Sequence, residues 1–81
     1  MLIPLYGFVR GDTLGLLVLV QGTDTVAELA ANMTQAASPR IPPGSRAIVR
    51  RNGAVLDDAL TVAEVGFTPL ERVDLTLEPG A

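Results

Sequence analysis

Apolar residues fill most of the first quarter of the chain and are interrupted by one short polar segment. Residues 2–9 are almost entirely apolar, Arg10-Gly11-Asp12-Thr13 supplies turn residues, and residues 14–20 form a second run of Leu and Val. Short apolar runs separated by turn residues are typical of a β-hairpin. We therefore expect strands at 2–9 and 14–20. Pro4 cannot donate a hydrogen bond to a sheet, so it should lie near the start of its strand or face an unpaired position.

The spacing of apolar residues changes after Gly22 to three and four, the pattern of a helix with one apolar face. The residues that share this face are Val26, Leu29, Ala30, Met33 and Ala37. Asp24 or a neighbouring threonine is placed to cap the helix, and Glu28 lies in the first turns, where the helix dipole favours an anion. Proline cannot continue a helix, so the proline-containing segment 38–45 should be a connecting loop.

The second half of the chain returns to alternation. Residues 46–51 place Ala47 and Val49 on one face and Arg46, Ile48 and Arg50 on the other. Asn52-Gly53 predicts a tight turn into a short strand at 54–56.

A helical turn at 61–65 should follow and end at Gly66 with positive φ. The last strand, at 72–77, should point Val73, Leu75 and Leu77 inward and Arg72, Asp74 and Thr76 outward.

This order of elements predicts an α+β fold, a mixed sheet of four to five strands packed on one helix. The chain resembles ubiquitin over nearly its whole length, including "IPPGSR" and "NGAVLDDALTVAEVGFTPLERVDLTL". The resemblance implies a ubiquitin-like β-grasp, which we expect to form a single domain over residues 1–81, with 79–81 as a short tail. Where ubiquitin displays its apolar recognition patch, this sequence has Arg50, Asp74 and Thr76, so ordinary ubiquitin receptors should not bind it.

Composition narrows the function. The 81 residues include no Cys, His or Lys, and the net charge is −3. Without imidazole, thiol or amine groups the usual nucleophile and base arrangements cannot be built, so we expect no enzyme and no catalytic, cofactor-binding or metal-binding residues. The acidic balance argues against nucleic acid as a partner. No apolar run approaches the roughly 20 residues needed to cross a bilayer, and we expect a cytoplasmic protein with no membrane association.

In the first two strands both the odd-numbered and the even-numbered residues are mostly apolar. Because these two sets point to opposite faces of the sheet, one apolar set must face away from the helix. If Leu16, Val18 and Val20 point inward, Leu17 and Leu19 point outward, beside Tyr6 and Phe8 or their neighbours in the first strand. A contiguous exposed apolar patch marks an interface; the alternative is a covered or twisted sheet edge.

Arginines form a second candidate surface. Arg40, Arg46, Arg50 and Arg51 lie close together in the sequence, and the planar guanidinium suits carboxylates across an interface. The alternative is a solvated face balanced by nearby acids. The predicted partner-binding residues are Tyr6, Phe8, Leu17, Leu19, Arg46, Arg50 and Arg51.

Within the ubiquitin-like proteins the chain resembles the small B (gamma) subunit of multicomponent diiron toluene and related monooxygenases. The matching stretches are "GDTLGLLVLV", "DTVAELA", "IVRRNG" and "TVAEVGFTPLERVDL". The resemblance implies a noncatalytic accessory subunit, without cofactor, that docks on the large hydroxylase subunit of an aromatic or hydrocarbon monooxygenase.

Two other functions stay open. One is a free-standing ubiquitin-like adaptor, for example in a bacterial secretion system. The other is a carrier or modifier. The final residues, Glu-Pro-Gly-Ala, depart from the paired glycines of ubiquitin-type modifiers, so we expect no covalent conjugation.

Overall fold

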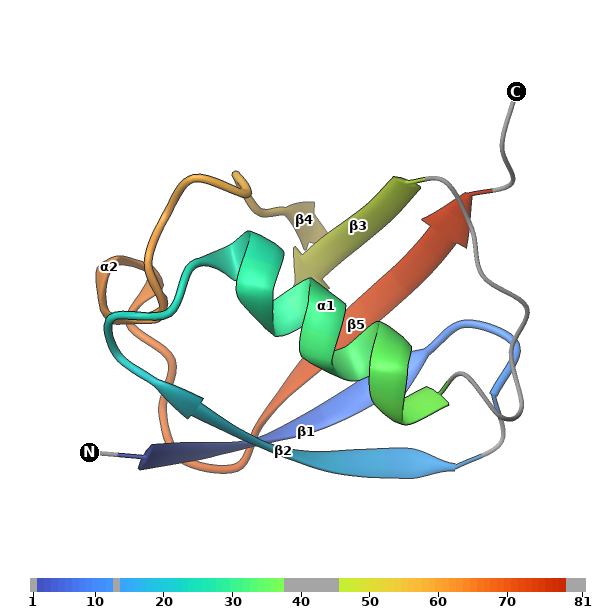
Figure 1. Cartoon of the computed structure of the whole chain (residues 1–81), viewed down its shortest axis with the longest axis horizontal. Helices are drawn as coiled ribbons and strands as arrows, with labels where there is room; N and C mark the ends of the chain where they lie inside the picture. Colours follow the sequence, from blue (N-terminus) through green and yellow to red (C-terminus); the bar gives the residue numbers. More distant parts are fainter. Residues whose placement is uncertain (1, 13, 38–45, 79–81) are drawn as a thin grey trace.

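The computed structural model describes residues 2–12, 14–37 and 46–78, and shows a five-stranded mixed sheet with one main helix lying across it (Figure 1). The elements in chain order are β1 (Leu2–Val9), β2 (Gly15–Gln21), α1 (Val26–Ala37), β3 (Arg46–Arg51), β4 (Ala54–Val55), α2 (Val62–Val65) and β5 (Glu71–Glu78). The strand order is β2-β1-β5-β3-β4, and only the β1–β5 pair is parallel. This is the α+β arrangement predicted from the order of elements. The predicted loop 38–45, which contains Arg40, and the predicted tail 79–81 lie outside the described residues.

One hydrophobic core lies between the sheet and α1. The five apolar residues predicted for the helix are all buried: Val26, Leu29, Ala30, Met33 and Ala37. The sheet contributes the inward side chains of Leu5, Val9, Val18, Val20, Val49, Val73 and Leu75. The predicted alternation of β2, β3 and β5 is confirmed.

The helix packs closely on the sheet because β1 carries a glycine beneath it. Gly7 is buried, and a Cβ atom built there would lie 2.7 Å from Met33 Cε and 3.3 Å from Val18 Cγ2. Contacts this short are repulsive, so the missing side chain makes room for Met33.

Strand ends differ slightly from the predicted ones, for local reasons. β2 begins at Gly15, because the Leu14 backbone N–H donates to the Asp12 carboxylate (3.2 Å) and not to a strand. β4 ends at Val55, although Leu56 N–H still donates to Val49 O (2.9 Å). The turn between β3 and β4 has positive φ at both Asn52 (51°) and Gly53 (81°), the geometry that the Asn-Gly pair favours.

Each helix begins at a threonine that shares hydrogen bonds with the glutamate three residues later. Thr61 Oγ1 accepts from Glu64 N–H (3.1 Å), and the Glu64 carboxylate accepts from Thr61 N–H (3.0 Å). The same exchange joins Thr25 and Glu28 at α1 (3.1 and 3.2 Å). These are capping boxes, each satisfying two backbone donors, and the hydrogen bond from the backbone N–H of Thr61 lowers the pKa of Glu64. The cap of α1 is therefore the threonine next to Asp24.

The C-terminal end of α2 also follows the prediction. Gly66 has φ 78° and its N–H donates to Val62 O, so the residue closes the helical turn in the left-handed conformation that glycine adopts at least cost. Within the described residues no helix is long and apolar enough to span a membrane.

Candidate interaction face

The face of the sheet turned away from α1 carries three of the predicted partner-binding side chains, Tyr6, Leu17 and Leu19, as neighbours on β1 and β2. In the strand register Tyr6 of β1 lies opposite Leu17 of β2 on one side and opposite Arg72 of β5 on the other. Pro4 lies opposite Leu19 in the same hairpin. Opposed residues on one face lie about 4.5–5.5 Å apart at Cβ, so these side chains are contiguous.

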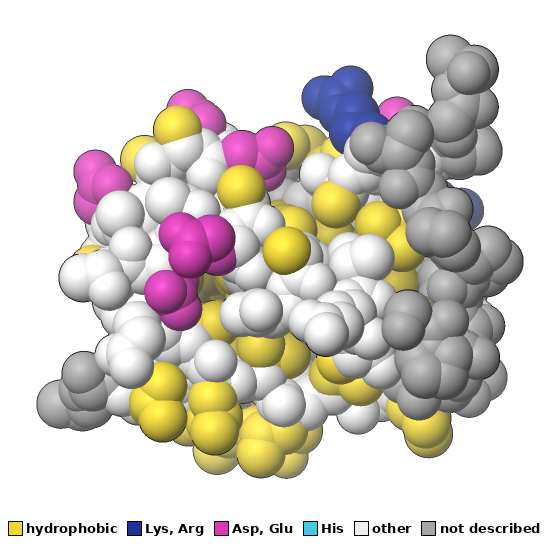
Figure 2. All heavy atoms as spheres, in the orientation of Figure 1, with side chains coloured by type: hydrophobic (Ala, Val, Ile, Leu, Met, Phe, Trp, Pro, Cys, Tyr) yellow, Lys and Arg dark blue, Asp and Glu magenta, His cyan; other side chains and the backbone are white. Residues whose placement is uncertain are grey.

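The part of this face over β1 and β2 is apolar and open to solvent. Leu17 is 62% exposed, Leu19 54% and Tyr6 46%. Figure 2 shows apolar side chains projecting at the lower edge of the molecule, where β2 runs in Figure 1. We call Pro4, Tyr6, Leu17 and Leu19 the outer apolar patch. Pro4 was not predicted as part of this surface, although it lies two residues before Tyr6 and therefore points to the same face of β1.

Phe8 borders the outer apolar patch but is held between neighbours. A Cβ atom on Gly15, its partner in β2, would meet the Phe8 ring at 3.1 Å. The Arg72 guanidinium carbon lies 4.3 Å from the ring centroid, a cation–π geometry, and Arg72 also donates to Asp74 (3.0 Å). Phe8 thus joins the apolar part of the face to its charged part.

The remainder of the outer face is polar. Arg50 lies opposite Asp74 in the register of β3 and β5 and donates to the Thr76 hydroxyl (3.0 Å). Arg46 is exposed at the start of β3. Arginine is enriched in protein interfaces, where polar residues form the rim around an apolar centre. An outer face with an apolar part and a part that contains arginines has this composition.

Arg51 has a different environment from Arg50, since consecutive residues of a strand point to opposite faces. Its guanidinium makes a two-pronged ion pair with Glu71, in which Nη2 and Oε1 are 3.0 Å apart, and donates to Val65 O (2.8 Å). It also lies 5.4 Å from the centroid of Phe67. The hydrogen bond from Arg51 lowers the pKa of Glu71 despite partial burial of the carboxylate. Arg51 therefore links β3 to the start of β5. The alternation of side chains along the strand could have shown from the sequence that Arg51 and Arg50 lie on opposite faces.

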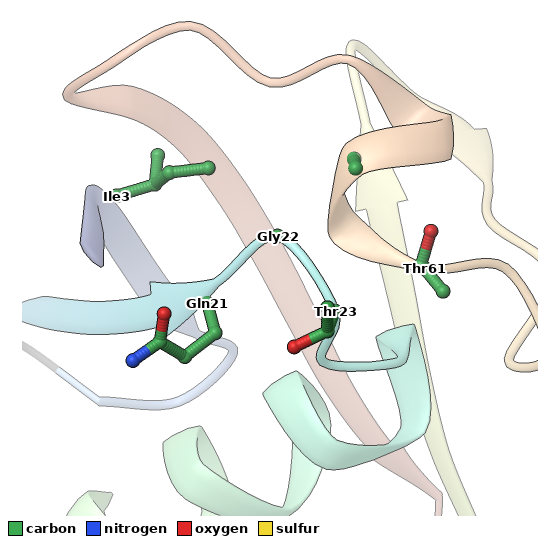
Figure 3. A pocket seen from close by; sticks show the side chains of 6 residues that line it. Ile3, Gln21, Gly22, Thr23 and Thr61 are labelled. Atoms are coloured by element: carbon green, nitrogen blue, oxygen red, sulfur yellow. The ribbon is translucent and has the colours of Figure 1, made fainter. Parts of the chain in front are cut away.

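A hollow of about 680 Å³ opens where the sheet meets α2. Figure 3 shows Ile3 of β1, Gln21 at the end of β2, Thr23 after it, and Thr61 before α2 around the hollow. The described residues that line it carry no titratable side chain, so none of them is a candidate general acid or base.

Metal binding also lacks a candidate in the described part of the chain. No three carboxylate, histidine or cysteine side chains of residues 2–12, 14–37 and 46–78 come together in a way that would hold an ion.

Comparison with known proteins gives the same fold. A chain from a structure described as a toluene 4-monooxygenase HD complex with the inhibitor 4-bromobenzoate is 24% identical, with a TM-score of 0.88 over 96% of this chain and 100% of that one. Ubiquitin from Caldiarchaeum subterraneum is 17% identical, with a TM-score of 0.80 over 100% of this chain and 99% of the other. No curated protein sequence matches. The ubiquitin-like β-grasp is therefore confirmed.

The family follows from a separate comparison. The model of the family described as toluene-4-monooxygenase system protein B (TmoB) matches residues 2–76, nearly the whole chain. The resemblance drawn from "GDTLGLLVLV" and "TVAEVGFTPLERVDL" is thereby confirmed. This chain belongs to the TmoB family, the B components of toluene-4-monooxygenase systems.

Proposed function

We propose that this protein is a noncatalytic accessory subunit that docks on the hydroxylase of a multicomponent diiron monooxygenase of the aromatic or hydrocarbon type. Membership of the TmoB family supports a place in such a system. The observation that carries the docking role is the outer apolar patch, because a small domain gains nothing from holding two leucines and a tyrosine in solvent unless another protein covers them.

The patch has the composition of a binding anchor. Burying a leucine side chain that was exposed contributes roughly 1.5–3 kcal/mol, and Leu17 and Leu19 are adjacent on the same face of β2. Tyr6 and Phe8 add aromatic area, which is enriched at the centre of interfaces. Arg50 lies on the same face, separated from Phe8 by Asp74 of β5, and Arg46 lies farther along β3. Both guanidinium groups suit carboxylates at the edge of the contact. We leave Arg51 out of the docking surface, because its donors are used by Glu71 and Val65.

The composition of the outer face supports this role over a catalytic one. The side chains gathered on the outer face suit binding through area and hydrogen bonds, and Glu28, Asp57, Glu64, Glu71 and Asp74 are engaged at helix starts, a turn and ion pairs. Under this proposal the protein contributes surface to the hydroxylase and the hydroxylase performs the chemistry.

Affinity capture tests the proposal. The tagged protein is expressed in its native host at its natural level, captured, and the bound proteins are identified by mass spectrometry and assayed for iron. Recovery of an iron-containing hydroxylase in near-equal amount supports the accessory role. The Leu17→Asp and Leu19→Asp double variant should recover no hydroxylase. Ala31→Asp is its matched control, since Ala31 is exposed on α1, on the opposite side of the sheet from the outer apolar patch. Recovery of partners without iron would favour a ubiquitin-like adaptor instead.

A further inference from the structure

β2 is an edge strand, and the identity of one residue in β1 fixes which of its backbone groups are open. Opposed residues of an antiparallel pair alternate between pairs that exchange two hydrogen bonds and pairs that exchange none. Pro4 has no N–H and lies opposite Leu19, so this pair is of the second kind. The N–H and C=O groups of Leu19 therefore point away from β1, and by alternation those of Leu17 and Gly15 do too.

Two hydrogen bonds agree with this assignment. The C=O of Pro4 accepts from Leu70 N–H (2.6 Å), on the β5 side of β1 and away from β2. Gln21 shares its parity with Leu19, and its N–H donates to the Asp24 carboxylate (2.8 Å) instead of to β1. Asp24 thus occupies the outward N–H and C=O groups of Gln21. The outward backbone groups of Gly15, Leu17 and Leu19 are the ones left for a further strand.

This edge lacks the usual protection against strand pairing. Natural edge strands carry charges, prolines or bulges, or are very short. Residues 15–20 contain no charged residue and no proline, and the pairing with β1 runs without a bulge from Gln21 to Gly15. The opposite edge, β4, has two residues. Among the described residues, no hydrogen bond outside the sheet involves Gly15, Leu17 or Leu19.

We propose that an extended segment of the hydroxylase pairs with the edge of β2 over Gly15–Leu19 and adds a sixth strand to the sheet. This inference rests on the proposed function and specifies its geometry. The added segment carries apolar side chains on the outer face, where they continue the outer apolar patch beyond Leu17 and Leu19, and no charge opposite those residues. Main-chain hydrogen bonds position the partner, and the apolar side chains select it.

The size of the edge points to a large partner and not to a second copy of this chain. Five paired residues span about 17 Å. A contact of that length and one strand wide falls far below the roughly 800 Å² per partner that a stable interface buries. The strand therefore has to belong to a protein that also covers the adjacent face, from Leu17 to Tyr6.

Amide hydrogen exchange tests the added strand directly. The ¹⁵N-labelled chain is exchanged in D₂O alone and in the purified complex with the hydroxylase, then quenched and read by NMR in an aprotic solvent. In the free chain Leu17 and Leu19 amides should exchange fast, and Val18 and Val20 amides slowly. In the complex the Leu17 and Leu19 amides should slow by at least about tenfold, as expected for backbone groups that become hydrogen-bonded.

A pair of variants gives a second readout. Leu17→Ala removes the side chain and keeps the open N–H, whereas Leu17→Pro removes both and spares the hydrogen bonds to β1. Affinity for the hydroxylase should be roughly fivefold weaker for Leu17→Pro than for Leu17→Ala, the loss expected for one backbone hydrogen bond. Should Leu17→Pro fail to fold, the exchange measurement on the natural sequence still decides.

Three outcomes would overturn the inference. A complex that forms while the Leu17 and Leu19 amides keep their free rates means that docking uses side chains alone, and the proposed function survives. Protection that rises with the concentration of the free chain identifies a second copy as the occupant. Failure of the complex to form removes the proposed function and the added strand together.

Discussion

Thr25 and Thr61 lie opposite each other in an isolated antiparallel bridge, and each begins a helix. The residues flanking them exchange hydrogen bonds, Val26 N–H to Leu60 O (2.8 Å) and Val62 N–H to Asp24 O (2.7 Å). Both threonines start the same four residues, Thr-Val-Ala-Glu, and both valines are buried in the common core. The short α2 is therefore held in place by the start of α1, which explains why the chain makes one helical turn before it enters β5.

Thr61→Ala should lower the free energy of unfolding by about 1 kcal/mol, because it removes the hydroxyl that accepts from Glu64 N–H and donates to the Glu64 carboxylate. Urea unfolding followed by circular dichroism measures the change. Thr23→Ala is the control, since Thr23 is exposed and outside the helix caps. Equal stability of the Thr61 and Thr23 variants would show that the capping box of α2 contributes nothing.

Gly7→Ala should destabilise the fold by about 1 kcal/mol, the low end of the cost of overpacking a core, because the closest contact is with the end of the flexible Met33 side chain. The added methyl group meets Met33 Cε, which has to move. Gly22→Ala is the matched control, because the nearest atom there, Ala63 Cβ, is 3.5 Å from the new Cβ. Combining Gly7→Ala with Met33→Ala should give a smaller loss than the sum of the two single losses. Simple additivity would mean that Gly7 and Met33 do not compete for space.

The Arg51–Glu71 pair predicts a loss of stability in acid. The pKa of Glu71 is lowered in the folded state, mainly by the hydrogen bond from Arg51, so the stabilisation is complete above the ordinary pKa of 4.5 and is lost as the pH falls through the lower folded value. Glu71→Gln should cost about 1 kcal/mol near pH 7 and flatten the decline between pH 4.5 and the folded pKa.

Unfolding free energies at several pH values measure this prediction. Glu78→Gln serves as control, since Glu78 is exposed at the other end of β5. The role assigned to Arg51 fails if the Glu71 and Glu78 variants share one pH profile.

Leu17→Asp combined with Leu19→Asp should abolish hydroxylase binding and leave the isolated protein folded. Both side chains are exposed on the outer face, so the core loses nothing, whereas two carboxylates prevent an apolar contact. Circular dichroism checks the fold, and capture of the hydroxylase checks binding. An unfolded double variant would place these side chains in the core and remove the basis of the docking surface.

Much of this molecule could be predicted from local pattern. The spacing of Val26, Leu29 and Met33 predicted the buried face of α1, and Asn52-Gly53 and Gly66 predicted turns because their backbone conformations favour those residues. The family resemblance was visible in the same stretches and is confirmed by the match over residues 2–76. These properties depend on neighbours in the chain, which a sequence displays.

The candidate site was only partly predictable. Alternation in β2 predicted that Leu17 and Leu19 share a face, and their side chains are exposed. Two contacts join residues on different strands: the ion pair of Arg51 with Glu71, and the cation–π contact of Arg72 with Phe8. Such pairings depend on the register between β1, β3 and β5, and no local pattern in those strands specifies it.

The sequence by itself determined the elements, the apolar faces and the absence of His, Cys and Lys chemistry, because these follow from residue type and spacing. Only the tertiary structure decided which apolar residues stay in solvent and which backbone groups of β2 remain open. Pro4 illustrates the difference. Its missing N–H can be read from the sequence, but its consequence for Leu19 requires the register that places the two residues opposite each other, since hydrogen bonding in a sheet is a property of paired strands.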